Sequence, residues 1–213
     1  MMREFRSVTS VAAPLLENAI DTDIIFPARF LLLMDRDGLG RYAFNGRRSN
    51  TDTPFILDTP PYDKAEILVT GETFGTGSSR EQAVWAIAGL GIRVVIARSF
   101  GEIFENNCFK NGVLAITLAD AAMAAIEKAA LAAEPVTVDL ETREVLLANG
   151  EAFGFEVEPA RREALLKGLD EVGLILERHE KDIAVHEARR AETAPWLAID
   201  PARLAAVAAD DTE

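Results

Sequence analysis

Three short apolar runs rich in β-branched residues recur in the middle of the chain, at residues 65–70, 93–97 and 113–116. Runs of this length between turn signals are typical of buried strands. Residues 81–90, which lie between the first two runs, place apolar side chains at helical spacing, and residues 99–112 are expected to form a second short helix. This strand–helix–strand–helix–strand order is a βαβ arrangement. It predicts an α/β fold around a parallel sheet.

Further elements are predicted on both sides of this core. They are a strand over 8–16, a helix over 120–134 stopped by Pro135, short strands over 136–140, 144–147 and 153–157, and an amphipathic helix over 159–176 interrupted near Gly173. Ser99 is the expected N-cap of the second core helix. The segment 35–61 is rich in Gly, Asn, Asp, Thr and Pro, and so long an irregular stretch is typical of a functional loop or a partner-binding arm.

Charge and cysteine content narrow the functional classes. The 213 residues carry 22 Lys and Arg against 35 Asp and Glu, a net charge of −13 that argues against a nucleic-acid partner. The sequence has neither a long apolar span nor a signal-peptide core, so we expect a cytoplasmic protein and no membrane contact. The single cysteine, Cys108, excludes an internal disulfide and an iron–sulfur cluster held by this chain alone. Such a cysteine is more often buried packing than a nucleophile.

The segment Gly75-Thr76-Gly77-Ser78-Ser79-Arg80-Glu81 is the main candidate site. A Gly-rich turn that opens into a helix presents backbone N–H groups at the positive end of the helix dipole, which favours an anion. Ser78 and Glu81 have the spacing of a capping box. Arg80, in the first helical turn, opposes the dipole, which makes sense if it holds a ligand carboxylate or phosphate. A tight turn with a capping serine and a solvated arginine is an equally good interpretation. The glycine pattern matches neither a Walker A loop nor a dinucleotide fingerprint.

Two other groups of polar residues have weaker interpretations. Asp21 and Asp23 could orient a hydroxyl, a cationic side chain or a metal, although an Asx-turn is the favoured role. His179 and His186 share a predicted helix face, but two ligands do not make a zinc site, and a solvated surface is favoured. The chain therefore offers no evident histidine base, metal set or cofactor loop. These candidate residues suggest that the chain supplies only half of an active site and that a partner chain supplies the rest.

Several long motifs resemble the swivelling domain of the aconitase superfamily, and within it the small subunits of 3-isopropylmalate dehydratase. The matching stretches are 71–81, 92–96 and 99–112, supported by 21–31 and 168–197. The resemblance implies a swivelling β/β/α domain over residues 1–198, with a βαβ core sheet and additional short strands, and a disordered C-terminal tail over residues 199–213.

The resemblance also implies an activity. The chain would be the small subunit of a heteromeric hydro-lyase that isomerises 2-isopropylmalate and 3-isopropylmalate, by dehydration and rehydration, in leucine biosynthesis. It would carry no metal or cofactor of its own. It would close over a [4Fe–4S] cluster on a separate large subunit, where one iron acts as a Lewis acid on the hydroxy-dicarboxylate substrate.

Site residues follow from the same resemblance. Ser78 is the expected base, as an alkoxide that takes the proton from the substrate carbon, and its ionised form needs helix-terminal N–H groups and a nearby cation. Ser79 and Arg80 would grip a substrate carboxylate. Asp23 aligns with an active-site aspartate of the family, and Arg29 is a further candidate for substrate contact.

The sequence departs from the family pattern in the run Ile24-Ile25-Phe26 and at three positions in and after the turn. Thr76, Gln82 and Val84 stand where small subunits of the family often have Cys, His and Pro. These changes are expected beside the pocket, so a related branched hydroxy-diacid such as 2-methylmalate (citramalate) is an alternative substrate. A non-catalytic, anion-binding assembly subunit is the alternative from a different class. The retained Ser78-Ser79-Arg80 argues against that second alternative.

Overall fold

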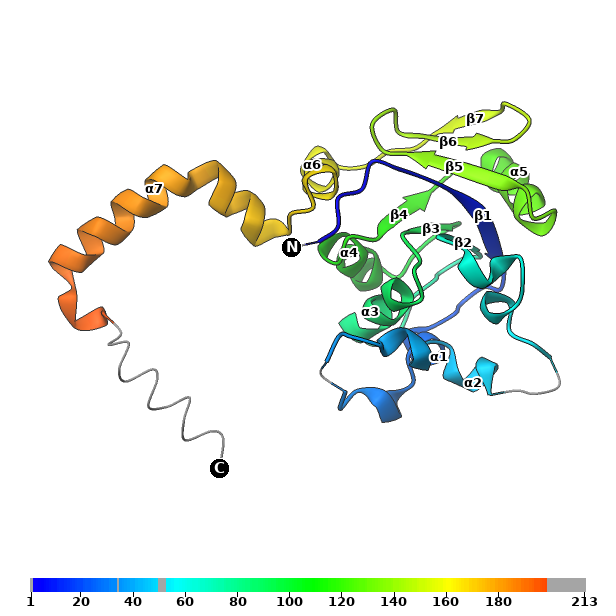
Figure 1. Cartoon of the computed structure of the whole chain (residues 1–213), viewed down its shortest axis with the longest axis horizontal. Helices are drawn as coiled ribbons and strands as arrows, with labels where there is room; N and C mark the ends of the chain where they lie inside the picture. The colour runs from blue at the N-terminus through cyan, green and yellow to red at the C-terminus, as the bar shows by residue number, and fades with distance from the viewer. Residues whose placement is uncertain (1, 34, 50–52, 199–213) are drawn as a thin grey trace. The chain divides into compact units, whose positions relative to one another are not determined.

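The computed structural model of the chain describes residues 2–33, 35–49 and 53–198. The chain divides into two compact units, Met1–Glu171 and Val172–Glu213. The first unit contains the whole sheet (Figure 1). In the second, the described residues form most of α7 (Glu171–Thr193), two helical stretches that meet at a kink at His179 (φ −121°, ψ 18°), and a short 3-10 turn, η5 (Pro195–Leu197). The tail predicted over residues 199–213 lies outside the described residues.

One mixed sheet of seven strands, in the order β4-β3-β2-β1-β5-β6-β7, organises the first unit. The strands are β1 (Ser7–Leu15), β2 (Ile67–Thr70), β3 (Val94–Ala97), β4 (Leu114–Thr117), β5 (Pro135–Asp139), β6 (Glu144–Leu147) and β7 (Ala152–Gly154). Strands β1 to β4 pair in parallel, and β5 to β7 continue the sheet from β1 in antiparallel pairs. The long strand β1 pairs with β5 through its first half and with β2 through its second half.

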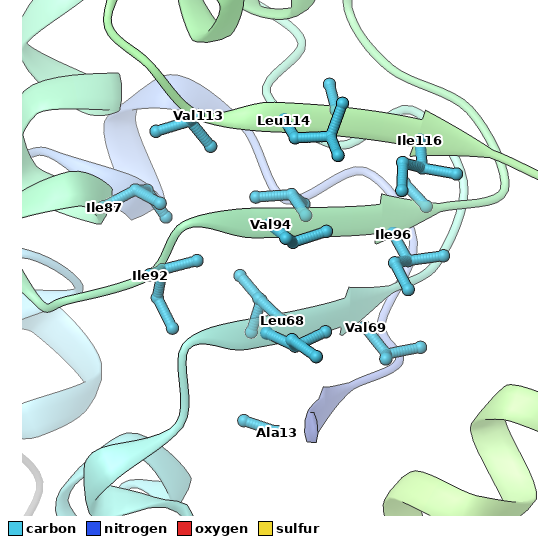
Figure 2. Close-up of a cluster of buried hydrophobic side chains, with 14 of the residues drawn as sticks. Ala13, Leu68, Val69, Ile87, Ile92, Val94, Ile96, Val113, Leu114 and Ile116 are labelled. Atoms are coloured by element: carbon cyan, nitrogen blue, oxygen red, sulfur yellow. The ribbon is translucent and has the colours of Figure 1, made fainter. Parts of the chain in front are cut away.

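Helices cover the parallel strands on both faces. Figure 1 shows α3 (Glu81–Gly89) and α4 (Glu102–Lys110) on one side of β2 to β4, and α5 (Asp120–Leu131) on the other. Strands β2 and β3 are buried at every position, as parallel strands between two helical layers must be. Figure 2 shows the aliphatic side chains of three neighbouring strands, including Leu68, Val94 and Leu114, packed into one cluster with Ile87 of α3.

This architecture confirms the predicted α/β fold with a βαβ core and additional short strands, but two local predictions were wrong. Ser99 does not cap α4, which begins after Gly101; its Oγ instead accepts a hydrogen bond from the Thr73 N–H at 2.8 Å. The amphipathic helix breaks at Gly168 rather than near Gly173. Gly168 has φ +65° and ends α6 (Pro159–Lys167), and its carbonyl accepts from the Met2 N–H at 3.0 Å.

The irregular segment 35–61 contains short helical turns in its described parts: η2 (Leu39–Tyr42), α2 (Asn45–Arg48) and η3 (Ile56–Asp58). Leu39 and Phe44 bury their side chains in the core. The backbone of Gly40 packs against that of Gly89 at the end of α3, since a Cβ built on Gly40 would lie 2.3 Å from the Gly89 carbonyl oxygen. The segment is therefore anchored on α3. No described helix has the length and apolar character needed to cross a membrane.

Cys108 should react slowly with iodoacetamide in the folded protein. Its side chain is completely buried in α4, and burial, followed by the charge of Glu105, raises the pKa of the thiol well above its ordinary value. Because the thiolate is the nucleophile, we expect alkylation at pH 8 to be at least roughly 100-fold slower than in the urea-unfolded chain. Mass spectrometry of the modified peptide measures both rates. Equal rates would contradict the burial.

Candidate active site

The turn that follows β2 lies between two other loops at the carboxyl edge of the parallel strands. On one side Thr76 forms an isolated parallel bridge with Asp21, and on the other Phe74 bridges Phe100. The Gly75 N–H donates to the Ile20 carbonyl at 2.8 Å. Ligands of open α/β sheets bind at this edge, because the loops after neighbouring parallel strands converge there.

Two glycines allow these loops to approach so closely. Gly75 has φ +73°, and a Cβ on it would lie 2.1 Å from Cγ of Phe104. A Cβ on Gly101 would lie 2.7 Å from the Gly75 carbonyl oxygen. A larger residue at Gly75 would therefore clash with the Phe104 side chain, and one at Gly101 would clash with the backbone of the turn.

The Asp21-Thr22-Asp23 segment fixes the other side of the turn. Asp21 caps the short helix α1 (Thr22–Ile25) by accepting from the Ile24 N–H at 2.7 Å, so the Asx-type role is confirmed for this residue. Thr22 is buried, and its hydroxyl donates to the Ser78 carbonyl oxygen at 3.0 Å. Its N–H also donates to the Thr76 carbonyl at 2.9 Å. Thr22 is a contact that sequence reasoning missed, because only the flanking carboxylates attracted a chemical interpretation.

Asp23 pairs with Arg80, 57 positions away. One Asp23 carboxylate oxygen and Nη1 of Arg80 form an ion pair; the Arg80 side chain is 14% exposed and that of Asp23 is 54% exposed. Nη1 also lies 3.5 Å from the Phe26 carbonyl oxygen. Within the described residues, Nε and Nη2 have no partner, so the edge of the guanidinium that suits bidentate carboxylate binding is available.

The predicted capping box is absent. Arg80 is itself the N-cap of α3, with extended φ −103° and ψ 104°, and no side chain caps the helix. Arg80 therefore lies just before the first helical turn rather than inside it. The Glu81 carboxylate accepts from the Asn111 amide at 2.8 Å instead of returning to the turn.

Ser78 and Ser79 are exposed at the outermost point of the turn. Across the part of the chain that the structure describes, neither hydroxyl and neither backbone N–H has a hydrogen-bond partner. The backbone is nevertheless fixed, because the Ser78 carbonyl accepts from both Thr22 and the Arg80 N–H, the latter at 2.8 Å. The turn thus presents two hydroxyls and two N–H donors beside the available edge of a guanidinium, an arrangement suited to a carboxylate.

The structure does not bring every predicted site residue together. Arg29 is exposed in η1 (Ala28–Phe30); its guanidinium donates to Asn45 and lies 4.7 Å from the Phe30 ring. Among the described residues, no contact joins it to Asp23 or to the turn. Val84 is completely buried in the core, whereas Thr76 and Gln82 are partly exposed, so only the latter two could meet a ligand directly.

Metal-ligating side chains do not gather near the turn in the described part of the chain. Among residues 2–33, 35–49 and 53–198, no group of three or more His, Cys, Asp or Glu side chains could hold a metal ion. The sequence has one cysteine, and it is buried, so these residues do not fit an iron–sulfur cluster. His179 lies 3.5 Å from Asp182 on the exposed surface of α7, where His186 is also exposed, which agrees with a solvated helix surface.

Two family descriptions match the sequence. The aconitase C-terminal domain matches residues 2–121, which include the sheet core and the turn. The C-terminal domain of the 3-isopropylmalate dehydratase small subunit matches residues 173–200.

Full-length relatives agree with both matches. The chain is 47% identical over 201 residues to a protein of Gluconacetobacter diazotrophicus named 3-isopropylmalate dehydratase small subunit, with 92% of this chain and 97% of that protein covered. A protein of Ruegeria sp. strain TM1040 with the same name is 44% identical over 202 residues, with 92% and 100% covered. The crystal structure of 3-isopropylmalate dehydratase (leuD) from Methanocaldococcus jannaschii matches the fold with a TM-score of 0.63 and 28% identity, over 85% of this chain and 99% of that one.

Proposed function

Because this chain belongs to the family of 3-isopropylmalate dehydratase small subunits, with their aconitase C-terminal domain, we propose that it is the small subunit of a cytoplasmic hydro-lyase. This enzyme isomerises 2-isopropylmalate and 3-isopropylmalate by dehydration and rehydration, a step of leucine biosynthesis. The observation that carries the proposal is the exposed Ser78-Ser79 pair beside the available edge of Arg80. Relatives 44–47% identical carry the isopropylmalate name, so neither 2-methylmalate nor a non-catalytic role is favoured.

Arg80 and Ser79 bind a substrate carboxylate in this proposal. Asp23 holds Nη1, which orients the guanidinium and leaves Nε and Nη2 to form two parallel hydrogen bonds with the carboxylate. The Ser79 hydroxyl and N–H supply further donors. Since Arg80 is mostly buried, its charge is poorly screened by water and acts strongly on an anion at the turn.

Ser78 takes the proton from the substrate carbon adjacent to the one that bears the departing hydroxyl, and the electrons of that C–H bond form the double bond as the hydroxyl leaves. A serine is a weak base, so the oxygen must bear its negative charge in a site that stabilises it. The nearby guanidinium and the unpaired N–H groups at the start of α3 are suited to that task. Thr22 holds the Ser78 carbonyl, which limits where the hydroxyl can point.

A large subunit supplies the other half of the site. It holds the [4Fe–4S] cluster, which provides a Lewis acid for the substrate hydroxyl when bound, since the residues of this chain do not fit such a cluster. Arg29 is proposed to contact the substrate only in that closed complex.

Reconstitution tests the proposed function. The chain should be co-expressed with its cognate large subunit and assayed anaerobically with 3-isopropylmalate, with ultraviolet detection of the unsaturated diacid intermediate. We expect turnover by the complex and none by either chain alone. A correctly assembled, cluster-loaded complex that turns over no isopropylmalate would refute the proposal.

Replacement of Arg80 by lysine should mainly weaken substrate binding. Lysine keeps the charge but cannot pair with Asp23 and hold a carboxylate through two parallel bonds at the same time. We expect KM to rise roughly 10–100-fold, because one charge-assisted hydrogen bond to the substrate is lost. The change in kcat should be smaller. Steady-state kinetics of the reconstituted complex measure both constants.

Arg48→Lys is the matched control for that variant. Arg48 also forms a two-point contact with a carboxylate, that of Asp58, but outside the turn. Its KM should stay close to that of the wild type. If both lysine variants raise KM equally, the effect comes from loss of surface ion pairs in general and Arg80 is not the carboxylate clamp.

Anaerobic treatment of the isolated chain with iron and sulfide should give no visible iron–sulfur absorption. One buried cysteine cannot replace the three or four thiolates that a cluster needs. The same treatment of the assembled heteromeric complex should give a brown, absorbing protein, which serves as the positive control. A brown isolated chain would contradict the proposal that only the large subunit holds the cluster.

A further inference from the structure

We propose that a chain of three hydrogen-bonded side chains, Trp85, Asn111 and Glu81, positions the catalytic turn from its carboxyl end. The inference rests on the proposed function and assigns these residues a positioning role in the same site. Glu81 is the first residue of α3 and follows Arg80 directly, whereas Asn111 is the C-cap residue of α4. The contact therefore joins the start of one helix to the end of the next.

The three side chains are joined by an unbroken series of short hydrogen bonds. The Trp85 Nε1–H donates to Oδ1 of Asn111 at 2.9 Å, and Nδ2 of Asn111 donates to Oε1 of Glu81 at 2.8 Å. The second N–H of the same amide donates to the Asn107 carbonyl at 2.9 Å. All three side chains are partly buried, so water competes poorly for these bonds.

Only one orientation of the Asn111 amide satisfies the chain. An indole N–H can only donate and an ionised carboxylate can only accept, so the amide oxygen must face Trp85 and the amide nitrogen must face Glu81. Turning the amide over would break both bonds. The arrangement therefore holds the Glu81 carboxylate in one place, on a helix end that otherwise lacks a side-chain cap.

The turn is held at both ends as a result. Thr22 binds the Ser78 carbonyl at the start of this stretch, and Asn111 binds Glu81, the residue after Arg80, at its end. Between these two attachments lie only the residues that the proposed reaction uses. The Glu81 carboxylate is bonded to Asn111 at the end of α4, so its role is to position Ser78 and Arg80 rather than to touch substrate.

Glu81→Ala and Glu81→Gln test the inference in the reconstituted complex with the large subunit. Alanine removes the acceptor, and we expect kcat to fall roughly 10–100-fold, because a displacement of about 1 Å of a catalytic group costs up to 10²-fold. Glutamine keeps an acceptor for Asn111 and should restore kcat to within about threefold, the range of one weakened hydrogen bond. Glu102→Ala is the matched control: Glu102 is exposed at the first position of α4, a helix of the same length as α3, and should keep wild-type kinetics.

Asn111→Asp adds a pH-dependent readout. At neutral pH the new aspartate would face the Glu81 carboxylate and repel it. At a lower pH the two carboxylates would share one proton, and that proton would restore the hydrogen bond between residues 111 and 81. Relative to the wild type, this variant should regain activity as the pH falls. A merely structural loss of packing would give a pH profile parallel to that of the wild type and would overturn the positioning role.

Hydrogen exchange on the isolated chain provides a measurement without turnover. The hydrogen-bonded amides of Thr76, Arg80 and Ala83 should exchange at least roughly tenfold faster in Glu81→Ala than in Glu81→Gln or Glu102→Ala, because local opening of the turn costs less without the contact. Unchanged exchange, or an Ala variant with wild-type kcat, would overturn the inference. An inactive wild-type complex would refute the proposed function instead, and exchange would then decide alone whether the contact positions the turn.

Discussion

Replacement of Ser78 by alanine is expected to lower kcat of the reconstituted complex roughly 10²–10⁴-fold, the usual contribution of a positioned general base. The substitution removes one oxygen and keeps the backbone that Thr22 and the Arg80 N–H hold through the Ser78 carbonyl. Because Arg80 and Ser79 remain in place, KM for 3-isopropylmalate should change less than about tenfold. Steady-state kinetics at saturating substrate, normalised to cluster content, measure the effect.

Ser79→Ala is the matched comparison, since it removes the same atom from the adjacent, equally exposed residue. If Ser79 binds a carboxylate and Ser78 moves a proton, Ser79→Ala should raise KM about tenfold, as expected for one lost hydrogen bond, with kcat reduced only modestly. Near-normal turnover of the Ser78 variant would rule out its role as base. Equal losses of kcat in both variants would mean that the two hydroxyls act together in binding.

The parallel core was predictable because its signals are local. Each strand of the core is a short β-branched run, and each helix between them has its own apolar period, so residues within one segment determine its type. The hairpins beyond β5 alternate buried and half-buried side chains, which is also a local pattern. What these patterns could not give is the strand order, in which β1 lies between β2 and β5.

The wrong local predictions share one cause: a contact with a residue far away in the sequence overrides the local motif. The Glu81 carboxylate binds Asn111 instead of returning to Ser78, and the Ser99 hydroxyl accepts from Thr73 instead of capping α4. Gly168, rather than Gly173, ends α6 because the N-terminal segment packs on it; a Cβ there would lie 2.6 Å from the Met2 carbonyl oxygen. None of these contacts has a signature in sequence spacing.

In the candidate site, too, the consecutive residues were predictable from the sequence and their distant partners were not. Ser78, Ser79 and Arg80 are consecutive, so the turn itself was identifiable from its residues as a candidate anion site. The Asp23 partner of Arg80 and the Thr22 partner of Ser78 come from another loop that the sheet brings alongside. Their roles depend on tertiary structure alone, and in the sequence they were visible only as a polar segment with several possible uses.

Replacement of Gly75 by alanine should be the most destabilising single-methyl change in the turn. The new Cβ would lie 2.1 to 2.6 Å from three atoms of Phe104, whose ring is buried against Phe74 at a centroid distance of 5.3 Å. We expect a loss of about 3–5 kcal/mol in the free energy of unfolding, from left-handed backbone strain and overpacking together. For a chain of this size that loss lowers Tm by roughly 10 °C, which calorimetry or circular dichroism can measure.

Substitutions at two other glycines separate the effect of backbone strain from that of the steric clash. Gly91→Ala adds strain without a clash, since Gly91 has φ +92° and its Cβ would meet nothing within 4 Å. Gly101→Ala adds a clash without strain, since Gly101 has φ −67° but its Cβ would lie 2.7 Å from the Gly75 carbonyl. The two losses should sum approximately to that of Gly75→Ala. If Gly91→Ala is as damaging as Gly75→Ala, backbone strain explains the whole effect and the close packing on Phe104 does not.

Phe104→Leu should then rescue Gly75→Ala in part. In the wild type this change opens space beside the turn and destabilises the protein by about 1–2 kcal/mol, whereas in the Gly75→Ala background it makes room for the new methyl group. The double variant should therefore be more stable than the sum of the two single losses. Additive losses would mean that Phe104 does not limit what fits at the turn.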